Sequence, residues 1–253
     1  MGSLNRTIQL LCIVPISTTG MTEDLGRAYK SSPGLDISFI DGRGLADCPP
    51  CIENLAQAFA STRAILPRAV DYITSHAIDG VLVCCFSDHP LVDALRELVT
   101  APVTGMFQAA LQEATQHGGK FGIVTTTRAW EKPLSDSVSE LGFRENSAGV
   151  AATGLGPLEL ESLDREAVVD RIGAFSKPLI NRGAQSIILG CAGMTALEAD
   201  ILAALPPGIR TVDGVRAGIS ILSRVVGETA IPGTALPRIV DSKGRKPARL
   251  YDF

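Results

Sequence analysis

Residues 81–90, VLVCCFSDHP, decide the fold of this chain, and residues 187–194, IILGCAGM, repeat their pattern. In each stretch an aliphatic run ends in a cysteine, and small or polar residues then lead into a predicted helix. Such runs are typical of buried parallel strands, and open α/β sheets bind ligands at the loops that follow their strands. We therefore expect Cys85 and Cys191 to lie at a ligand-binding edge, each with a helix N-terminus that favours its thiolate.

The same order of elements occurs twice along the chain. A strand, a cysteine, a helix and a short strand end at Thr104-Gly105, and the same series ends again at Asp213-Gly214. Repeated strand–helix order predicts parallel sheets with right-handed crossovers. We predict an α/β fold of two pseudo-symmetric lobes, each a parallel sheet flanked by helices, with the active site in the interlobe cleft. The first lobe is expected to comprise residues 1–117 plus 214–253, and the second residues 118–213.

Hydrophobic periodicity and turn residues predict the individual elements. Strands are expected at residues 7–14, 35–41, 79–86, 101–105, 120–126, 148–153, 185–190 and 209–213. Helices are expected at residues 21–31, 52–76, 89–99, 106–117, 128–141, 163–182, 196–205 and 215–226. Asp88 is predicted to cap the helix that contains Pro90, and Thr195 is predicted to form a capping box with Glu198.

The composition indicates an aliphatic α/β protein. Hydrophobic residues make up 45% of the 253 residues and aromatic residues only 5%. The formal net charge of −4 argues against nucleic-acid and anionic-membrane partners, and the basic cluster Lys243, Arg245, Lys246 and Arg249 is interpreted as a solvated tail. There is neither an apolar span of about 18 residues nor a signal-peptide pattern, and we interpret the cysteines as reduced thiols. A cytoplasmic homo-oligomer that binds no membrane is expected.

Cys85 and Cys191 are the candidate catalytic residues. Two thiols that face each other across a cleft suit a 1,1-proton transfer, in which one thiolate removes a proton and the other thiol returns one on the opposite face. Backbone N–H groups after each cysteine can hold the carbonyl oxygen of an enolate-like intermediate. These donors are Phe86, Ser87, Ala192 and Gly193. The alternative interpretation is two buried strand cysteines that catalyse nothing.

Cys48-Pro49-Pro50-Cys51 forms a CxxC motif in a loop rich in glycine and proline. A redox or zinc role is one interpretation, but zinc needs two further ligands of fitting spacing, and the three histidines form no cluster. Two loop thiols are the simpler interpretation, and no metal site is predicted.

Hydroxyl-bearing segments follow the first strand of each half, at Ser17-Thr18-Thr19 and at Thr125-Thr126-Thr127. Their side chains either bind carboxylate or amide groups of a substrate or cap the next helices. Neither turn has the glycine spacing of a nucleotide-binding loop, so no nucleotide cofactor is predicted.

Three segments resemble the signature segments of the Asp/Glu/hydantoin racemase superfamily, and in particular its hydantoin and allantoin racemase branch. They are Cys85-Phe86-Ser87-Asp88, Leu189-Gly190-Cys191-Ala192-Gly193-Met194 and Val212-Asp213-Gly214-Val215. The loop Pro49-x-Cys51-Ile52-Glu53 is similar to that branch's Pro-x-Ser-Ile-Glu loop, with cysteine in place of serine. The resemblance covers roughly residues 7–227.

The resemblance implies a racemase or epimerase without cofactor or metal, with Cys85 and Cys191 as its acid/base pair. One departure concerns the first loop, which commonly reads Asn-Pro-Asn-Ser/Thr in the family and reads Val14-Pro15-Ile16-Ser17 here. A hydantoin-like compound or a less polar carbonyl compound is therefore the expected substrate. The expected substrate-binding residues are Pro15, Ile16, Ser17, Thr18, Phe86, Ser87, Thr125, Thr126, Ala192 and Gly193.

Three other functions stay open at this point. One is a decarboxylase or cis–trans isomerase of the same superfamily that uses a single cysteine. Another is a non-catalytic small-molecule-binding protein on a two-lobed scaffold. The third is a thiol redox or metal protein centred on Cys48 and Cys51.

Overall fold

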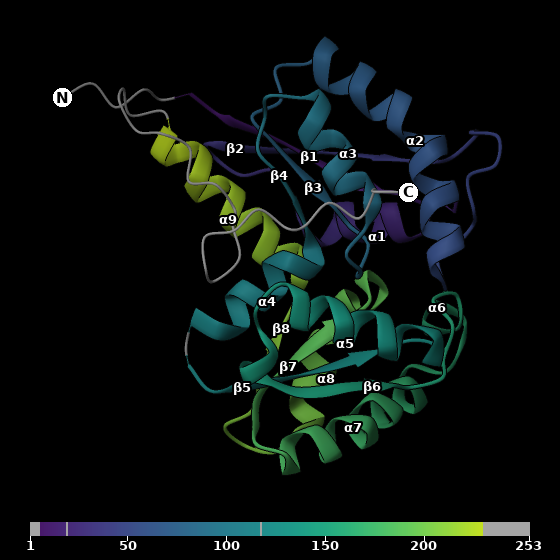
Figure 1. Ribbon diagram of the computed structural model, residues 1–253, viewed down its shortest axis with the longest axis vertical. Coiled ribbons are helices and arrows are strands. Elements are labelled where there is room, and N and C mark those ends of the chain that lie inside the picture. Colours follow the sequence, from purple (N-terminus) through teal and green to yellow (C-terminus); the bar gives the residue numbers. More distant parts are fainter. Residues whose placement is uncertain (1–5, 19, 117, 230–253) are drawn as a thin grey trace.

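The computed structural model describes residues 6–18, 20–116 and 118–229, and within these ranges the strands form two four-stranded sheets (Figure 1). The first has the order β2-β1-β3-β4, with β1 (Ile8–Val14), β2 (Leu35–Asp41), β3 (Gly80–Val83) and β4 (Val103–Gly105). The second has the order β6-β5-β7-β8, with β5 (Lys120–Thr125), β6 (Ser147–Ala152), β7 (Ala184–Gly190) and β8 (Arg210–Val212). All these pairings are parallel, and the shared order confirms the predicted α/β fold of two similar lobes.

Helices cover both faces of the first sheet. Side chains alternate along β1, so that Leu10 and Cys12 pack toward one set of helices while Leu11 and Ile13 pack toward another. The first set is α1 (Gly20–Ala28), α4 (Met106–Gln116) and α9 (Gly214–Thr229), and the second is α2 (Leu55–Ser75) and α3 (Pro90–Leu98). Apolar side chains on both faces explain the continuous hydrophobic runs that predicted these strands.

Around the second sheet, α7 (Arg165–Asn181) and α8 (Glu198–Ala204) pack on one face and α5 (Glu131–Glu140) on the other. The helix predicted at 163–182 is preceded by a separate short helix, α6 (Glu159–Ser162). Three short 3-10 helices, η1 (Arg128–Trp130), η2 (Arg144–Asn146) and η3 (Ala192–Leu197), complete the elements of the described ranges.

One hydrophobic cluster is shared by the two lobes. It includes Leu82 of the first sheet and Ile123 and Ile188 of the second. The chain passes between the lobes at α4, which packs against β5, β7 and β8, and returns at α9, which packs against β1, β3 and β4. These two helices also pack on each other, and a Cβ at Gly214 would lie only 2.6 Å from the carbonyl oxygen of Met106. The two sheets are thus joined by an apolar core and by two closely packed helices.

The division into lobes is a proposal that this packing supports. We propose that residues 6–18, 20–116 and 214–229 belong to the first lobe and residues 118–213 to the second, because α9 packs on strands of the first sheet. Residues 1–5, 19 and 117 of the predicted first lobe lie outside the described residues. Residues 230–253, with the basic cluster Lys243, Arg245, Lys246 and Arg249, lie outside the described residues. Among the described helices, none is long and apolar enough to cross a membrane.

Two helix caps predicted from the sequence are wrong. The residue that caps α3 is His89, whose Nδ1 accepts the N–H of Leu91 at 3.2 Å, whereas Asp88 accepts a hydrogen bond from Gln108. Leu197 precedes α8 without a side-chain cap, and the carboxylate of Glu198 instead binds side chains outside α8. Those partners are Thr211 and Arg216. In both places a tertiary partner engages the carboxylate that local spacing had assigned to a cap.

Candidate active site

Cys85 lies just beyond β3, a central strand of the first sheet. The N–H of Cys84 donates to the carbonyl oxygen of Ile13 at 2.8 Å and so extends the pairing with β1 past the end of the strand. The chain then turns, with the N–H of Ser87 bound to the carbonyl oxygen of Cys85 at 3.0 Å. The Ser87 Oγ lies 3.6 Å from the Cys85 sulfur.

Cys191 lies at the equivalent place in the second sheet, directly after β7. It is the N-cap residue of η3, and its carbonyl oxygen accepts the N–H of Met194 at 3.0 Å. The residue before it has no room for a side chain, because a Cβ at Gly190 would lie 2.5 Å from the carbonyl oxygen of Val124. The close approach of β5 and β7 therefore sets the position of the Cys191 backbone.

Both cysteines line one cavity between the lobes, with about 490 Å³ of space including its open mouth. The cavity lies where the central strands β1 and β3 of one sheet and β5 and β7 of the other reach their carboxyl ends. The residues of the predicted site that line it are Pro15, Ile16, Cys85, Phe86, Thr126, Cys191 and Ala192. The structure therefore brings together both cysteines and residues from the first loop of each lobe.

The remaining described residues of the predicted site are not among those that line this cavity. The hydroxyl of Thr18 donates to the carbonyl oxygen of Pro50 at 2.9 Å, and that of Thr125 donates to the carbonyl oxygen of Gly190 at 3.0 Å. Ser17 binds through its N–H to the carbonyl oxygen of Pro49 at 2.9 Å. These contacts hold loops in place. Of the described residues in the two hydroxyl segments, only Thr126 lines the cavity. Ser87 and Gly193 flank the cysteines, and Thr19 lies outside the described residues.

The cavity also contains residues that the predicted site omits. They are Val14, Met21, Cys51, Ile52, Cys84, Trp130, Pro157 and Gly190. Cys48 and Cys51 are both free thiols in a loop. Cys51 nevertheless faces the cavity, whereas Cys48 is buried against Gly42. The sequence signals were the CxxC motif for Cys51 and the single tryptophan of the chain for Trp130.

The two sheets, the cysteines at their equivalent strand ends and the shared cavity agree with one sequence family. Residues 10–222 match the family model described as Asp/Glu/Hydantoin racemase. The chain belongs to this racemase family. It is 29% identical to a hydantoin racemase of Rhizobium meliloti, over 79% of this chain and 83% of that protein. It is also 35% identical to an uncharacterized protein of Schizosaccharomyces pombe, over 87% of this chain and 92% of that protein.

A solved structure supports the same branch of the family. Allantoin racemase from Klebsiella pneumoniae matches this racemase-family chain with a TM-score of 0.76 and 27% sequence identity. The match covers 87% of this chain and 88% of that one. These findings confirm the resemblance to the hydantoin and allantoin racemases that the signature segments indicated.

In this racemase-family protein, burial raises the pKa of both cavity thiols. The pKa of Cys85 is raised to about 12 because burial disfavours its thiolate; the nearby Ser87 hydroxyl opposes the shift and Cys191 adds to it. The pKa of Cys191 is raised to about 11, again chiefly by burial, and the N–H of Gly193 opposes that shift. The N–H of Gly193, at the start of η3, favours the Cys191 thiolate as predicted, but helix N-termini do not set the pKa of either thiol. Helix α3 begins only at Pro90, and burial outweighs the one N–H at Cys191.

His89 follows closely after Cys85 but is unsuited to acid–base chemistry. It is 2% exposed, and burial lowers its pKa to about 3. Its Nδ1 accepts the N–H of Leu91, so its proton lies on Nε2, which has no hydrogen-bond partner among the described residues. Within the same part of the chain, no group of three or more His, Cys, Asp or Glu side chains is placed to hold a metal ion. The thiols are the candidate acid and base that the cavity offers.

The predicted backbone donors divide into two groups. The N–H of Ser87 is occupied by the carbonyl oxygen of Cys85, and that of Gly193 faces the Cys191 sulfur. In the structure the N–H of Ser87 therefore already has an acceptor, and its role as a donor to a substrate oxygen stays a prediction. Phe86 and Ala192 line the cavity and are the better candidates for that role.

Proposed function

We propose that this protein is a cofactor-independent racemase or epimerase that acts on a carbon next to a carbonyl group through the thiols of Cys85 and Cys191. One observation carries the proposal: thiols at equivalent strand ends of the two lobes line the same cavity. Membership of a racemase family supports the reaction class. Inversion of a carbon centre needs a base on one face and an acid on the other, and thiols from opposing lobes meet that need.

The raised pKa values suit the removal of a proton from a weak carbon acid. A thiolate whose thiol has a pKa of about 11 or 12 is a stronger base than an ordinary thiolate, although less of it is present at neutral pH. One sulfur takes the proton from carbon and the other gives one back, so the pair holds one proton before and after each turnover. The N–H groups of Phe86 and Ala192 and the hydroxyl of Thr126 are candidate partners for the substrate carbonyl.

The residues that line the cavity indicate what kind of substrate it suits. Val14, Ile16 and Trp130 line the cavity, so the end of β1, the first loop and η1 contribute apolar side chains to its wall. A hydantoin-like ring or a less polar carbonyl compound that carries an apolar substituent suits such a wall.

Deuterium exchange tests the two-thiol mechanism. The protein is incubated with single stereoisomers of hydantoins and of aryl-substituted carbonyl compounds in deuterated water, and wild type should invert and label the α-carbon. In Cys85→Ser and in Cys191→Ser, the rate of inversion should fall at least about a thousandfold, because serine is too weak a base to replace the thiol. Each variant should still exchange one isomer with retention, and the two variants should prefer opposite isomers. Full inversion by either variant would show that the replaced cysteine is not catalytic.

The same assay separates the other candidate functions. A decarboxylase with one essential cysteine would turn over a malonate-type substrate in one of the two serine variants. A binding protein would hold the compounds without labelling them. A thiol redox protein would depend on Cys48 and Cys51 and would tolerate both serine variants.

Cofactor independence, assembly and location are parts of the proposal with their own measurements. Dialysis against a chelator should leave the rate unchanged, and restoration by an added metal or pyridoxal phosphate would contradict the mechanism. All six cysteines are free, as in a reducing compartment, and we propose a cytoplasmic enzyme. We also propose a homo-oligomer, which light scattering of the purified protein will test.

A further inference from the structure

The loop between β3 and α3, which carries Cys85, is held by two consecutive residues of α4. Phe86 packs edge-to-face on Phe107, with ring centroids 5.3 Å apart and planes at 81°. Two residues further along the loop, the carboxylate of Asp88 accepts a hydrogen bond from Nε2 of Gln108 at 3.0 Å. One helix therefore contacts this loop through an apolar side chain and through a polar one.

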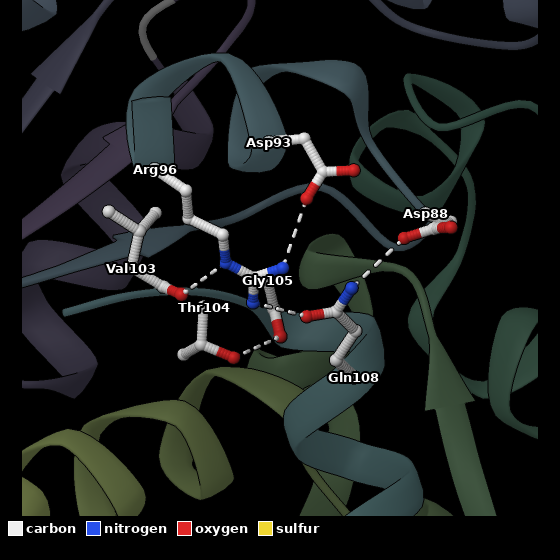
Figure 2. Close-up of polar contacts among 7 residues, drawn as sticks. All are labelled: Asp88, Asp93, Arg96, Val103, Thr104, Gly105 and Gln108. Carbon is white, nitrogen blue, oxygen red and sulfur yellow. Dashed lines mark hydrogen bonds and ion pairs between the residues drawn. The ribbon is translucent and has the colours of Figure 1, made fainter. Parts of the chain in front are cut away.

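Gln108 is bound at both ends of its side-chain amide (Figure 2). Its Oε1 accepts Nη2 of Arg96 at 2.9 Å, while its Nε2 donates to Asp88. Arg96 also donates to the carbonyl oxygen of Val103 at 3.1 Å and to Asp93 at 3.0 Å. A guanidinium has only donors and a carboxylate only acceptors, so the Gln108 amide fits between them in one orientation. The chain of contacts runs from α3 and β4 through α4 to the Cys85 loop.

The same helix contacts the other lobe. Helix α4 packs against β7, and β7 leads directly to Cys191. Gln108 is 7% exposed and therefore lies in the packed interior rather than on a free surface. Its hydrogen bond to Asp88 thus connects the Cys85 loop to α4, and α4 packs on β7, the strand that leads to Cys191.

We propose that Gln108 is a positioning residue, which holds Cys85 at the distance from Cys191 that proton transfer requires. The inference rests on the proposed function, because only a two-thiol reaction demands that both sulfurs reach one carbon. Reacting atoms must approach to about 3–3.5 Å, and a misplacement of about 1 Å costs on the order of a hundredfold in rate. Gln108 itself touches no reacting atom and acts through Asp88.

The test exchanges the amide and the carboxylate of the hydrogen bond between Gln108 and Asp88. Gln108→Glu sets two carboxylates against each other and should move the loop, whereas Asp88→Asn keeps an acceptor for the Gln108 amide. In the double variant, the amide introduced by Asp88→Asn donates to the carboxylate introduced by Gln108→Glu, which still accepts from Arg96. Gln108→Glu should lower kcat for inversion about ten- to a hundredfold with little change in KM. For Asp88→Asn and for the double variant, kcat for inversion should stay within about threefold of the wild-type value.

Two further measurements separate positioning from general damage. In Gln108→Glu, Cys191 keeps its place, so exchange with retention of one isomer should persist while inversion falls. The alkylation rate of Cys85 should change and return to the wild-type value in the double variant, while that of Cys191 stays constant. Gln112→Glu, one helical turn further along α4 and outside this chain of contacts, is the matched control and should behave as wild type.

The outcomes decide between the two proposals. An active wild type with a Gln108→Glu variant that inverts equally well overturns the positioning role alone, and so does a double variant that fails to recover. A wild type that neither exchanges nor inverts any compound overturns the proposed function, and the alkylation rates then decide whether Gln108 holds the loop. If Gln108→Glu does not fold, Asp88→Ala removes the same contact and must show the same excess of exchange over inversion.

Discussion

At the scale of single residues, the property that matters most is the protonation of two partly buried thiols. Cys85 and Cys191 have pKa values raised to about 12 and about 11, because burial penalises the charged form more than the neighbouring donors stabilise it. A racemase that works through them starts from a small fraction of thiolate. The rate of inversion should therefore follow the ionisation of these two thiols over a wide range of pH.

We expect kcat/KM to rise about tenfold per pH unit from pH 7 toward pH 10. The sign follows from the direction of the shift: a raised pKa keeps both groups as thiols at neutral pH, and each added unit of pH increases the reactive thiolate proportionally. The measurement is kcat/KM for inversion in constant ionic strength, with the uncatalysed exchange of the substrate recorded at each pH. A plateau beginning below about pH 8.5 would mean that the thiolate is stabilised in the site.

At the scale of elements, the close approach of β5 and β7 decides where Cys191 lies. A Cβ at Gly190 would meet the carbonyl oxygen of Val124 at 2.5 Å and the Cα of Thr125 at 2.9 Å. Both of these atoms belong to the backbone of a central strand, which cannot move aside as a flexible side chain would. Glycine is therefore required by space at this position.

Gly190→Ala should lower the free energy of unfolding by about 1–3 kcal/mol, the usual cost of overpacking, and should also slow inversion because Cys191 is displaced. Urea unfolding measures the first effect. Gly173→Ala is the matched control, because a Cβ there meets its nearest atom at 4.0 Å, and alanine favours a helix interior by up to about 1 kcal/mol. Equal stability of Gly190→Ala and wild type would contradict the spacing of β5 and β7.

At the scale of the whole molecule, the cavity exists because two lobes meet there. Val14 and Ile16 come from the first lobe and Trp130 from the second, and all three line the space beside the thiols. All three side chains belong to the apolar cluster that the two lobes share. The cavity wall therefore combines residues that lie more than a hundred positions apart in the sequence.

Replacing Val14 and Ile16 together by asparagine should shift selectivity toward polar rings. Unreactive hydantoin analogues should bind more tightly and aryl-substituted carbonyl analogues more weakly, each by about 5- to 100-fold, since an unpaired buried polar group costs about 1–3 kcal/mol. Fluorescence of the single tryptophan reports binding, because Trp130 lies in the cavity wall. Trp130→Phe is the control and should lose the signal. An unchanged preference would show that the first loop does not contact the ligand.

The sequence by itself determined the order of the strands and helices, their repetition in two similar halves, and the position of Cys85 and Cys191 just after equivalent strands. Each of these depends on local pattern: a short run such as Ile187-Ile188-Leu189, rich in β-branched residues and followed by glycine, favours a buried strand, and the residues after it are then expected at the edge of the sheet. The signature segments around Cys85 and Cys191 likewise indicated the family before any fold was known. Local pattern was enough because strands and loops are short-range properties of the chain.

Only the tertiary structure decided which other groups join these thiols and how they ionise. Cys51 and Trp130 reach the cavity through loops whose course depends on packing, and Asp88 binds Gln108 rather than the helix end that follows it. The thiol pKa values rose instead of falling because burial depends on every segment packed around the cavity. Burial and long-range hydrogen bonds are made between residues distant in sequence, so no local pattern contains them.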